Sequence, residues 1–176
     1  CMCKDMRLTT LVDVYNAIIG KGGEEIVLTD EVYGYLEEIW EVSEKSKGAL
    51  DVTIGMVTKL WDLDNWAAME MNVQEFQVPQ VSELQSKLQN TGYEKVLLQN
   101  GKVILPEGMS LDLGAVGKGI ACDRMGDCLK ENATITGAVI SVGGSVVTYG
   151  TKPNGEMWNV AIIHPRQEGA FLGSLS

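Results

Sequence analysis

The segment "SLDLGAVGKGIACDR" (110–124) places the tightest constraint on the fold, because it joins a strand-like pattern to a helix-like pattern through a glycine-rich turn. The three glycines within 114–119 let the backbone bend sharply and approach a neighbouring segment closely. The segment therefore predicts a strand over 109–113, a turn that carries Asp112, and a helix over 118–131.

Two common nucleotide-binding motifs do not fit this turn. A Walker loop would need a glycine where Asp112 stands and a serine or threonine where Gly119 stands. A dinucleotide fingerprint counted from Gly114 would need a glycine at Val116.

Two interpretations of the turn stay open on these residues alone. It can be a tight strand-to-helix connection with no ligand. It can also hold an anionic group of one or two phosphates, because exposed amides at a helix start and the nearby Lys118 attract negative charge. Asp112 would repel phosphate, so in a binding site it would meet a sugar hydroxyl, a ring N–H or a metal.

Composition limits the possible partners. A chain of 176 residues with 45% apolar residues is long enough for one compact core, which predicts a single domain over 1–176. The net charge of -10 argues against a nucleic acid or an anionic membrane surface as partner, since such partners require a basic patch. No apolar run approaches the ~20 residues of a membrane-spanning helix.

The predicted secondary structure changes from helices to strands along the chain. Residues 29–92 are predicted to be mainly helical, and 93–176 mainly strands. The first helix is capped by Thr29 and stopped by Gly48. Its predicted buried stripe is Val32, Leu36, Ile39, Trp40 and Val42.

Further helices are expected over 53–60 and over 81–92, where Gly92 is the stop signal, with an irregular connection over 62–79 between them.

The strand-rich half contains one clear hairpin. Asn100-Gly101 supplies the two positive-φ positions of a tight turn between strands. More strands are expected over 138–142, 146–149 and 158–163, with a turn at 153–155. The fold class is therefore α+β with antiparallel sheet. Cys122 and Cys128 are six positions apart, about 600° of helix rotation, which predicts free thiols on different faces rather than a shared zinc site.

Three longer segments together resemble one family. "SKGALDVTIGMVTKLWDL" (46–63), "LDLGAVGKGIACDR" (111–124) and "ISVGGSVVTYG" (140–150), the last followed by "WNVAIIHP" (158–165), occur in the order and spacing typical of the ApbE family. These are flavin transferases, formerly labelled thiamine biosynthesis lipoproteins. The resemblance spans nearly the whole chain, from about Met6 onward.

The resemblance implies an ApbE-like, T-fold-related fold and an enzyme of EC 2.7.1 type. It implies that the chain binds FAD with Mg²⁺ and transfers FMN to a Ser or Thr hydroxyl of an acceptor flavoprotein, releasing AMP. Alternatives on the same scaffold are an FAD-binding or FAD pyrophosphatase module, and a non-catalytic fragment. The implied location is the extracytoplasmic cell envelope, where some members are lipoproteins.

The resemblance also implies the site residues. The "GAFD" segment of the family corresponds to residues 48–51, with Leu50 in place of the frequent Phe, and Met6 stands where many members have Tyr. The backbone carbonyl of Ala115 matches a metal ligand. The cofactor-binding residues implied are Met6, Ala49, Leu50, Asp51, Asp112, Gly114, Lys118, Gly143 and Gly144.

The chain also departs from the family pattern, and it is expected to be shortened at both ends. Family members continue past the segment equivalent to "FLGSLS" into a T-S-G stretch, an H-I-x-D-P motif and a late Asp/Thr metal cluster. No catalytic residue is therefore assigned within 1–176. His164 is expected to be an exposed loop histidine rather than a substitute for the histidine of that motif.

Overall fold

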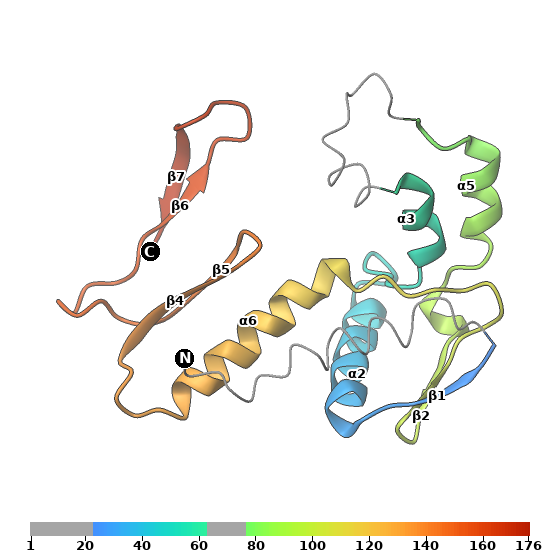
Figure 1. Cartoon of the computed structure of the whole chain (residues 1–176), viewed down its shortest axis with the longest axis horizontal. Coiled ribbons are helices and arrows are strands. Elements are labelled where there is room, and N and C mark those ends of the chain that lie inside the picture. The colour runs from blue at the N-terminus through green and yellow to red at the C-terminus, as the bar shows by residue number, and fades with distance from the viewer. Residues whose placement is uncertain (1–22, 63–76) are drawn as a thin grey trace. The chain divides into compact units, whose positions relative to one another are not determined.

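The computed structural model describes residues 23–62 and 77–176, and these form two compact units (Figure 1). The first unit comprises 23–62 and 77–115 of the described residues, and the second comprises Val116–Ser176. Helices and small antiparallel sheets alternate along the chain, which confirms the predicted α+β class. The single domain predicted over 1–176 stays a prediction.

The first unit opens with β1 (Glu25–Val27) and the helix α2 (Asp30–Lys45). The Thr29 hydroxyl accepts a hydrogen bond from the Val32 amide at 3.4 Å, which is the predicted N-cap. Gly48 adopts φ 80°, and its amide bonds the Ser43 carbonyl at 2.8 Å, as a C-terminal stop requires.

The buried face of α2 differs from the prediction at two positions, because the predicted Trp40 is only half-buried and the predicted Val42 is exposed. Val32, Leu36 and Ile39 are buried, but the predicted Val42 is 49% exposed and Ser43 is buried in its place. Ser43 continues the helical spacing of that face, and its hydroxyl donates to the Ile39 carbonyl at 2.9 Å. Ser43 can be buried because its hydroxyl already has a hydrogen bond inside the helix. Val42 precedes it by about 100° of helix rotation and lies on the exposed side.

Two shorter helices follow in the first unit. They are α3 (Gly55–Trp61) and α5 (Val81–Leu88), and they pack against each other (Figure 1). The start of α3 was predicted at 53, two residues too early, because residues 51–54 form a turn and a bridge to Ser110. Residues 63–76 of the predicted irregular connection lie outside the described residues.

A three-stranded antiparallel sheet completes the first unit, with the strand order β1-β3-β2. The strands β2 (Leu97–Gln99) and β3 (Lys102–Ile104) form the predicted hairpin, with φ of 53° at Asn100 and 75° at Gly101. The short 3₁₀ helix Tyr93–Lys95 precedes β2. The strand β1 was not predicted, because three residues carry too short a pattern to detect.

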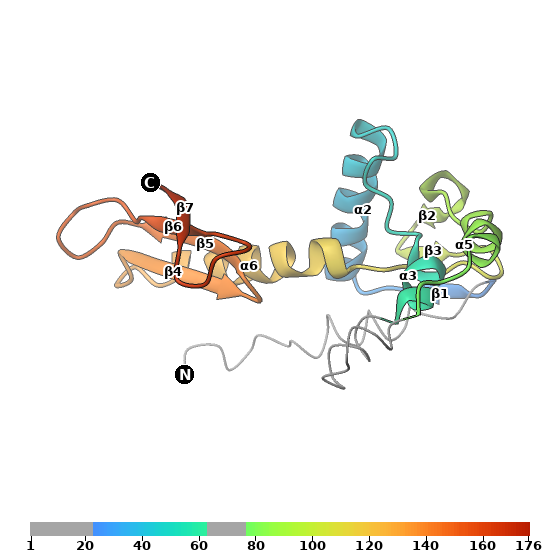
Figure 2. The same ribbon diagram turned by 90° about the horizontal axis from the view of Figure 1, so that it is seen from above.

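The second unit contains α6 (Gly114–Lys130) from Val116 onward and two hairpins, which form separate two-stranded sheets. Their strands β4 to β7 are labelled in Figure 2. One hairpin pairs β4 (Gly137–Val142) with β5 (Ser145–Gly150), and the other pairs β6 (Val160–Ile163) with β7 (Phe171–Leu175). The strand β7 was not predicted. The thiols are free as predicted, Cys122 buried and Cys128 exposed. Along the described ranges, no helix is long and apolar enough to cross a bilayer.

Two predictions about the glycine turn were wrong. Residues 109–113 do not form a strand of a sheet: Ser110 makes only an isolated parallel bridge with Ile54. The helix begins at Gly114 rather than near Lys118, because the Asp112 carboxylate accepts the Gly114 amide at 2.8 Å and fixes the helix start there. Lys118 therefore lies in the second turn of α6.

Candidate functional site

In the first unit, Asp51 lies in a turn that holds its carboxylate in one orientation. Its Oδ1 accepts two hydrogen bonds from Thr53, one from the backbone amide at 2.8 Å and one from the hydroxyl at 2.6 Å. The Thr53 hydroxyl oxygen in turn accepts the Gly92 amide at 2.7 Å. Thr53 is fully buried, so Asp51 is tied through it to the start of the 3₁₀ helix.

Residues on either side of Asp51 complete this turn. The Ala49 amide bonds the Ser46 carbonyl at 3.2 Å, and the Leu50 amide bonds the Ser46 hydroxyl at 3.1 Å. Ala49 is exposed, while Leu50 and Asp51 are half-buried. The segment predicted as a cofactor contact is therefore an ordered turn directly after α2.

Backbone bonds join the segment after Asp51 to the glycine turn. The Asp112 amide donates to the Val52 carbonyl at 2.7 Å, and the Gly55 amide donates to the Ser110 carbonyl at 2.9 Å. The parallel bridge between Ile54 and Ser110 lies between these two bonds. The structure thus brings two segments that are far apart in sequence side by side, and both carry predicted site residues.

Gly55 makes this approach possible. A Cβ added there would lie 2.7 Å from the carbonyl oxygens of both Ser110 and Leu111, closer than side chains approach backbone oxygens. Gly55 is buried and does not have a positive φ. A glycine is therefore required there because a side chain would not fit, and not because of the backbone conformation.

Asp112 is held much as Asp51 is. Its Oδ1 accepts the Gly114 amide at 2.8 Å, which leaves Oδ2 without a hydrogen bond in the part of the chain that the structure describes. The Oδ2 atom of Asp51 likewise has no hydrogen bond among the described residues. Each half-buried carboxylate therefore has one oxygen fixed by its own turn and one oxygen able to accept a ligand N–H or O–H.

Lys118, Gly143 and Gly144 belong to the second unit. Lys118 is exposed on α6, and within the described residues its ammonium has no ion-pair partner. The two glycines form the turn between β4 and β5, with φ of 53° and 89°. A Cβ on Gly143 would lie 3.0 Å from Cε of Lys118, so the structure brings these two predicted residues together.

The predicted metal ligand Ala115 is the second residue of α6 and is exposed. Its carbonyl lies in the first helical turn, where it accepts the intrahelical bond of the residue four positions later and keeps one lone pair. Across 23–62 and 77–176, no three His, Cys, Asp or Glu side chains gather as a metal site. The described residues do not fit a Mg²⁺ site by themselves. The predicted contact Met6 lies outside the described residues.

His164 does not lie among the predicted cofactor-binding residues. It follows β6, and its Nδ1 accepts the Arg166 amide at 3.1 Å, which is a local turn interaction. It is half-buried rather than exposed as predicted. Its backbone amide donates to the Ala170 carbonyl at 2.9 Å across the hairpin.

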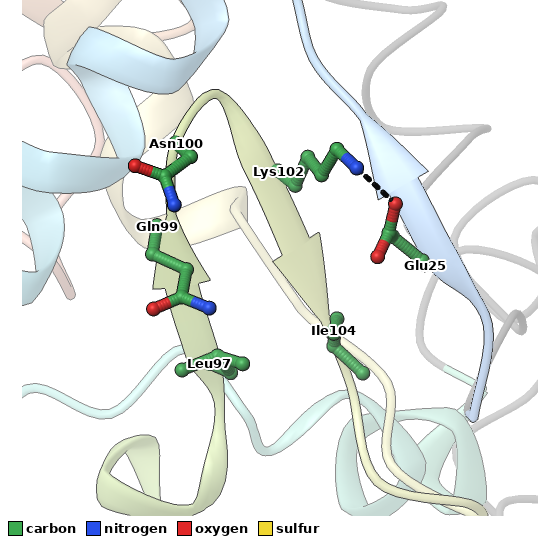
Figure 3. A pocket seen from close by; sticks show the side chains of 6 residues that line it. All are labelled: Glu25, Leu97, Gln99, Asn100, Lys102 and Ile104. Atoms are coloured by element: carbon green, nitrogen blue, oxygen red, sulfur yellow. Dashed lines mark hydrogen bonds and ion pairs between the residues drawn. The ribbon is translucent and has the colours of Figure 1, made fainter.

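Two of the hollows formed by the described residues differ in size and place, and both lie away from the predicted site residues. One has a volume of about 140 Å³ and lies on the three-stranded sheet. Figure 3 shows the residues that line it, with the Lys102 ammonium pointing at the Glu25 carboxylate in an ion pair. A larger cavity of about 780 Å³ lies between the end of α6 and β4 and is lined mainly by apolar side chains, including Met125, Leu129 and Ile140. No predicted site residue lines either hollow.

No role was predicted from the sequence for Thr53 and Gly55. Thr53 orients the Asp51 carboxylate, and Gly55 lets its segment approach the one that carries Asp112. The Asp-x-Thr spacing of residues 51–53 was the available signal, because an Asp side chain commonly accepts the amide two residues later. Gly55 carried no comparable signal, since its close neighbours Ser110 and Leu111 are distant in sequence. Ser110 is also buried, and its hydroxyl has no hydrogen-bond partner among the described residues.

Fold and site define an α+β protein in which a fixed aspartate turn is bonded to a glycine-rich connection that starts a helix. The family model described as "ApbE family" matches residues 9–176. The chain belongs to the ApbE family.

Two curated relatives named "FAD:protein FMN transferase" are similar to this chain. That of Klebsiella pneumoniae (strain 342) is 30% identical over 129 residues, which cover 70% of this chain and 35% of the relative. That of Treponema pallidum (strain Nichols) is 28% identical over 165 residues, covering 84% of this chain and 43% of the relative. The chain spans less than half the length of these relatives.

Solved structures show the same fold. The ApbE protein from Thermotoga maritima matches with a TM-score of 0.74 and 27% identity, over 92% of this chain and 52% of that protein. The flavin transferase ApbE from Vibrio cholerae matches with a TM-score of 0.72 and 21% identity, over 95% of this chain and 51% of that protein. These matches confirm the predicted ApbE-like fold.

Proposed function

We propose that this chain binds FAD and is part of an FAD:protein FMN transferase. Membership of the ApbE family and the names of the two relatives support the activity. The observation that carries the proposal is the pair of half-buried carboxylates, Asp51 and Asp112, each with one oxygen fixed and the other open. Open carboxylate oxygens suit the hydroxyl and N–H donors of a ribityl chain and a flavin ring.

The proposed contacts have separate roles. Asp51 and Asp112 accept hydrogen bonds from the flavin half of FAD, and the exposed Ala49 with Leu50 borders the ligand. Lys118 supplies positive charge for the pyrophosphate. The remaining proposed contacts are Met6, Gly114, Gly143 and Gly144.

The proposed reaction is a phosphoryl transfer. The Ser or Thr hydroxyl oxygen of the acceptor attacks the phosphorus of the FMN half, the bond to the bridging oxygen breaks, AMP leaves, and the hydroxyl proton is released. Such a reaction depends mainly on positioning and charge neutralisation, which is the role given to the Lys118 ammonium.

Mg²⁺ dependence is part of the proposal by resemblance, with the Ala115 carbonyl as a ligand from this chain. When bound, Mg²⁺ would supply charge neutralisation at phosphate oxygens. No step is assigned to it, because the described residues form no metal-binding cluster of their own. An extracytoplasmic location at the cell envelope is proposed on the same resemblance.

The first test is FAD binding by the chain, measured by quenching of flavin fluorescence with and without Mg²⁺. Asp112→Ala and Lys118→Ala are each expected to weaken binding by about 10–100-fold, the loss of one charge-assisted hydrogen bond. Lys59→Ala is the matched control, since it removes another exposed helical lysine outside the proposed site. Wild-type affinity in both site variants would refute these contacts.

The second test is transfer itself. The full gene product that contains this chain is incubated with FAD, Mg²⁺ and an acceptor domain, which is then assayed by mass spectrometry for added FMN. FMN on a Ser or Thr supports the transferase. FAD bound without any FMN on the acceptor would instead select an FAD-holding module, and FAD hydrolysed to FMN and AMP in solution would select a pyrophosphatase.

A further inference from the structure

The turn between β4 and β5 contains two glycines with different surroundings. Gly143 and Gly144 both have positive φ, 53° and 89°, so both suit the tight two-residue turn. A Cβ on Gly144 would meet nothing within 4 Å. A Cβ on Gly143 would lie 3.0 Å from Cε and 3.5 Å from Cδ of Lys118. The turn alone therefore explains Gly144, whereas Gly143 also faces a specific side chain.

The side chain beside Gly143 is Lys118, whose proposed role requires its ammonium to face an anion. Lys118 is exposed on α6, and a free lysine stem samples many rotamers. The Cδ and Cε methylene groups of Lys118 lie beside the space that a Cβ on Gly143 would fill, and this neighbouring turn limits the positions that the ammonium can take. Because no described acidic group pairs with it, the ammonium keeps its charge available for an anion.

We propose that Gly143 is a positioning residue for Lys118: the absence of a side chain there lets the lysine stem lie across the turn and directs its ammonium at an anion. This rests on the proposed function of Lys118 as the phosphate-facing cation. It assigns Gly143 a role toward Lys118 that does not require contact between Gly143 and the ligand.

Sterics indicate how a substitution would act. At 3.0 Å from Cε, an alanine methyl at 143 crowds a carbon near the end of a flexible side chain, so the cheapest response is movement of the lysine. The fold of the hairpin would survive with a displaced ammonium. Gly155→Ala is the matched control, since Gly155 has φ 83° in a turn of the same unit and open space around it.

The first measurement needs no ligand. The chain is treated with a limiting acylating reagent, and the modification rate of Lys118 is read by peptide mass spectrometry relative to Lys59. We expect Gly143→Ala to raise the Lys118 rate about threefold or more as the stem leaves the turn, and Gly155→Ala to leave it unchanged. Equal rates in wild type and Gly143→Ala would overturn the proposal.

The second measurement is FAD affinity. Gly143→Ala is expected to weaken binding about tenfold in the wild-type background and to have no further effect in the Lys118→Ala background, because the two changes act through one contact. Full additivity of the two substitutions would contradict the proposal. A changed labelling rate together with no FAD binding in any protein would support the positioning role and refute the proposed function.

A second variant covers the case in which alanine unfolds the hairpin. Asparagine tolerates positive φ better than alanine but still adds a Cβ. Gly143→Asn is therefore expected to give the same labelling change as Gly143→Ala, with a melting temperature closer to that of the wild type. A folded Gly143→Asn protein with wild-type labelling would also overturn the proposal.

Discussion

Gly55 gives the sharpest test of how the first-unit site is assembled. It is the first residue of α3, and Gly55→Ala is predicted to destabilise the protein even though alanine is the better helix former. Two effects oppose each other. Replacing a helical glycine by alanine gains at most about 1 kcal/mol, and less at a helix end. The new methyl would lie 2.7 Å from the carbonyl oxygens of Ser110 and Leu111.

The steric effect is expected to exceed the gain in helix propensity. Both oxygens belong to backbone, so neither can rotate away as a side chain would. Overpacking of this kind costs roughly 1–3 kcal/mol. Separating the segments also stretches the bond from the Gly55 amide to the Ser110 carbonyl, now 2.9 Å, which contributes about 1 kcal/mol. The expected net loss is about 2 kcal/mol.

The assay is urea unfolding, combined with hydrogen exchange at single amides. The Gly55 and Asp112 amides are expected to exchange about 30-fold faster in Gly55→Ala, since both bond across the junction. Gly34→Ala in α2 is the control, because that glycine is also helical and a Cβ added there would meet nothing within 4 Å. It should stabilise by about 0.5–1 kcal/mol. Stabilisation by both substitutions would refute the close approach at Gly55.

Two further predictions concern hydrogen bonds. Thr53→Val is expected to lower the free energy of unfolding in urea by about 2–3 kcal/mol, since it removes the hydroxyl that joins Asp51 to the Gly92 amide. Thr53→Ser keeps a hydroxyl and should recover most of the loss, so equal stability of the two variants would contradict this role. In α6, the hydrogen bond and charge of Lys130 lower the pKa of Asp127, so the pair stabilises the fold above the ordinary Asp pKa and the benefit disappears as pH falls through the lowered value. Lys130→Gln should raise the Asp127 pKa in a carboxyl NMR titration, and an unchanged pKa would show that the pair is not formed in solution.

Local chemistry explains which parts of the fold could be predicted. The cap at Thr29, the stop at Gly48 and the Asn100-Gly101 turn each depend on a side chain or a φ angle within a few residues. These elements were correct because one residue type has few alternatives at such positions. The segments resembling the ApbE family could likewise be recognised from their order and spacing in the sequence, and the match to the family model over 9–176 confirms that resemblance.

The failed predictions about the glycine turn depend on contacts between distant segments. The helix α6 begins four residues early because Asp112 caps Gly114, and Asp112 is placed by its bond to Val52. The pattern of apolar and polar residues does not predict this arrangement. Met109, Ser110 and Leu111 are all buried, so this segment lacks the alternation of buried and exposed residues that marks a strand. The same long-range bonding turns a predicted strand into a single bridge. In this chain the glycine turn is therefore defined less by its own glycines than by the segment after Asp51, which holds it through Val52 and leaves both aspartates with an open oxygen.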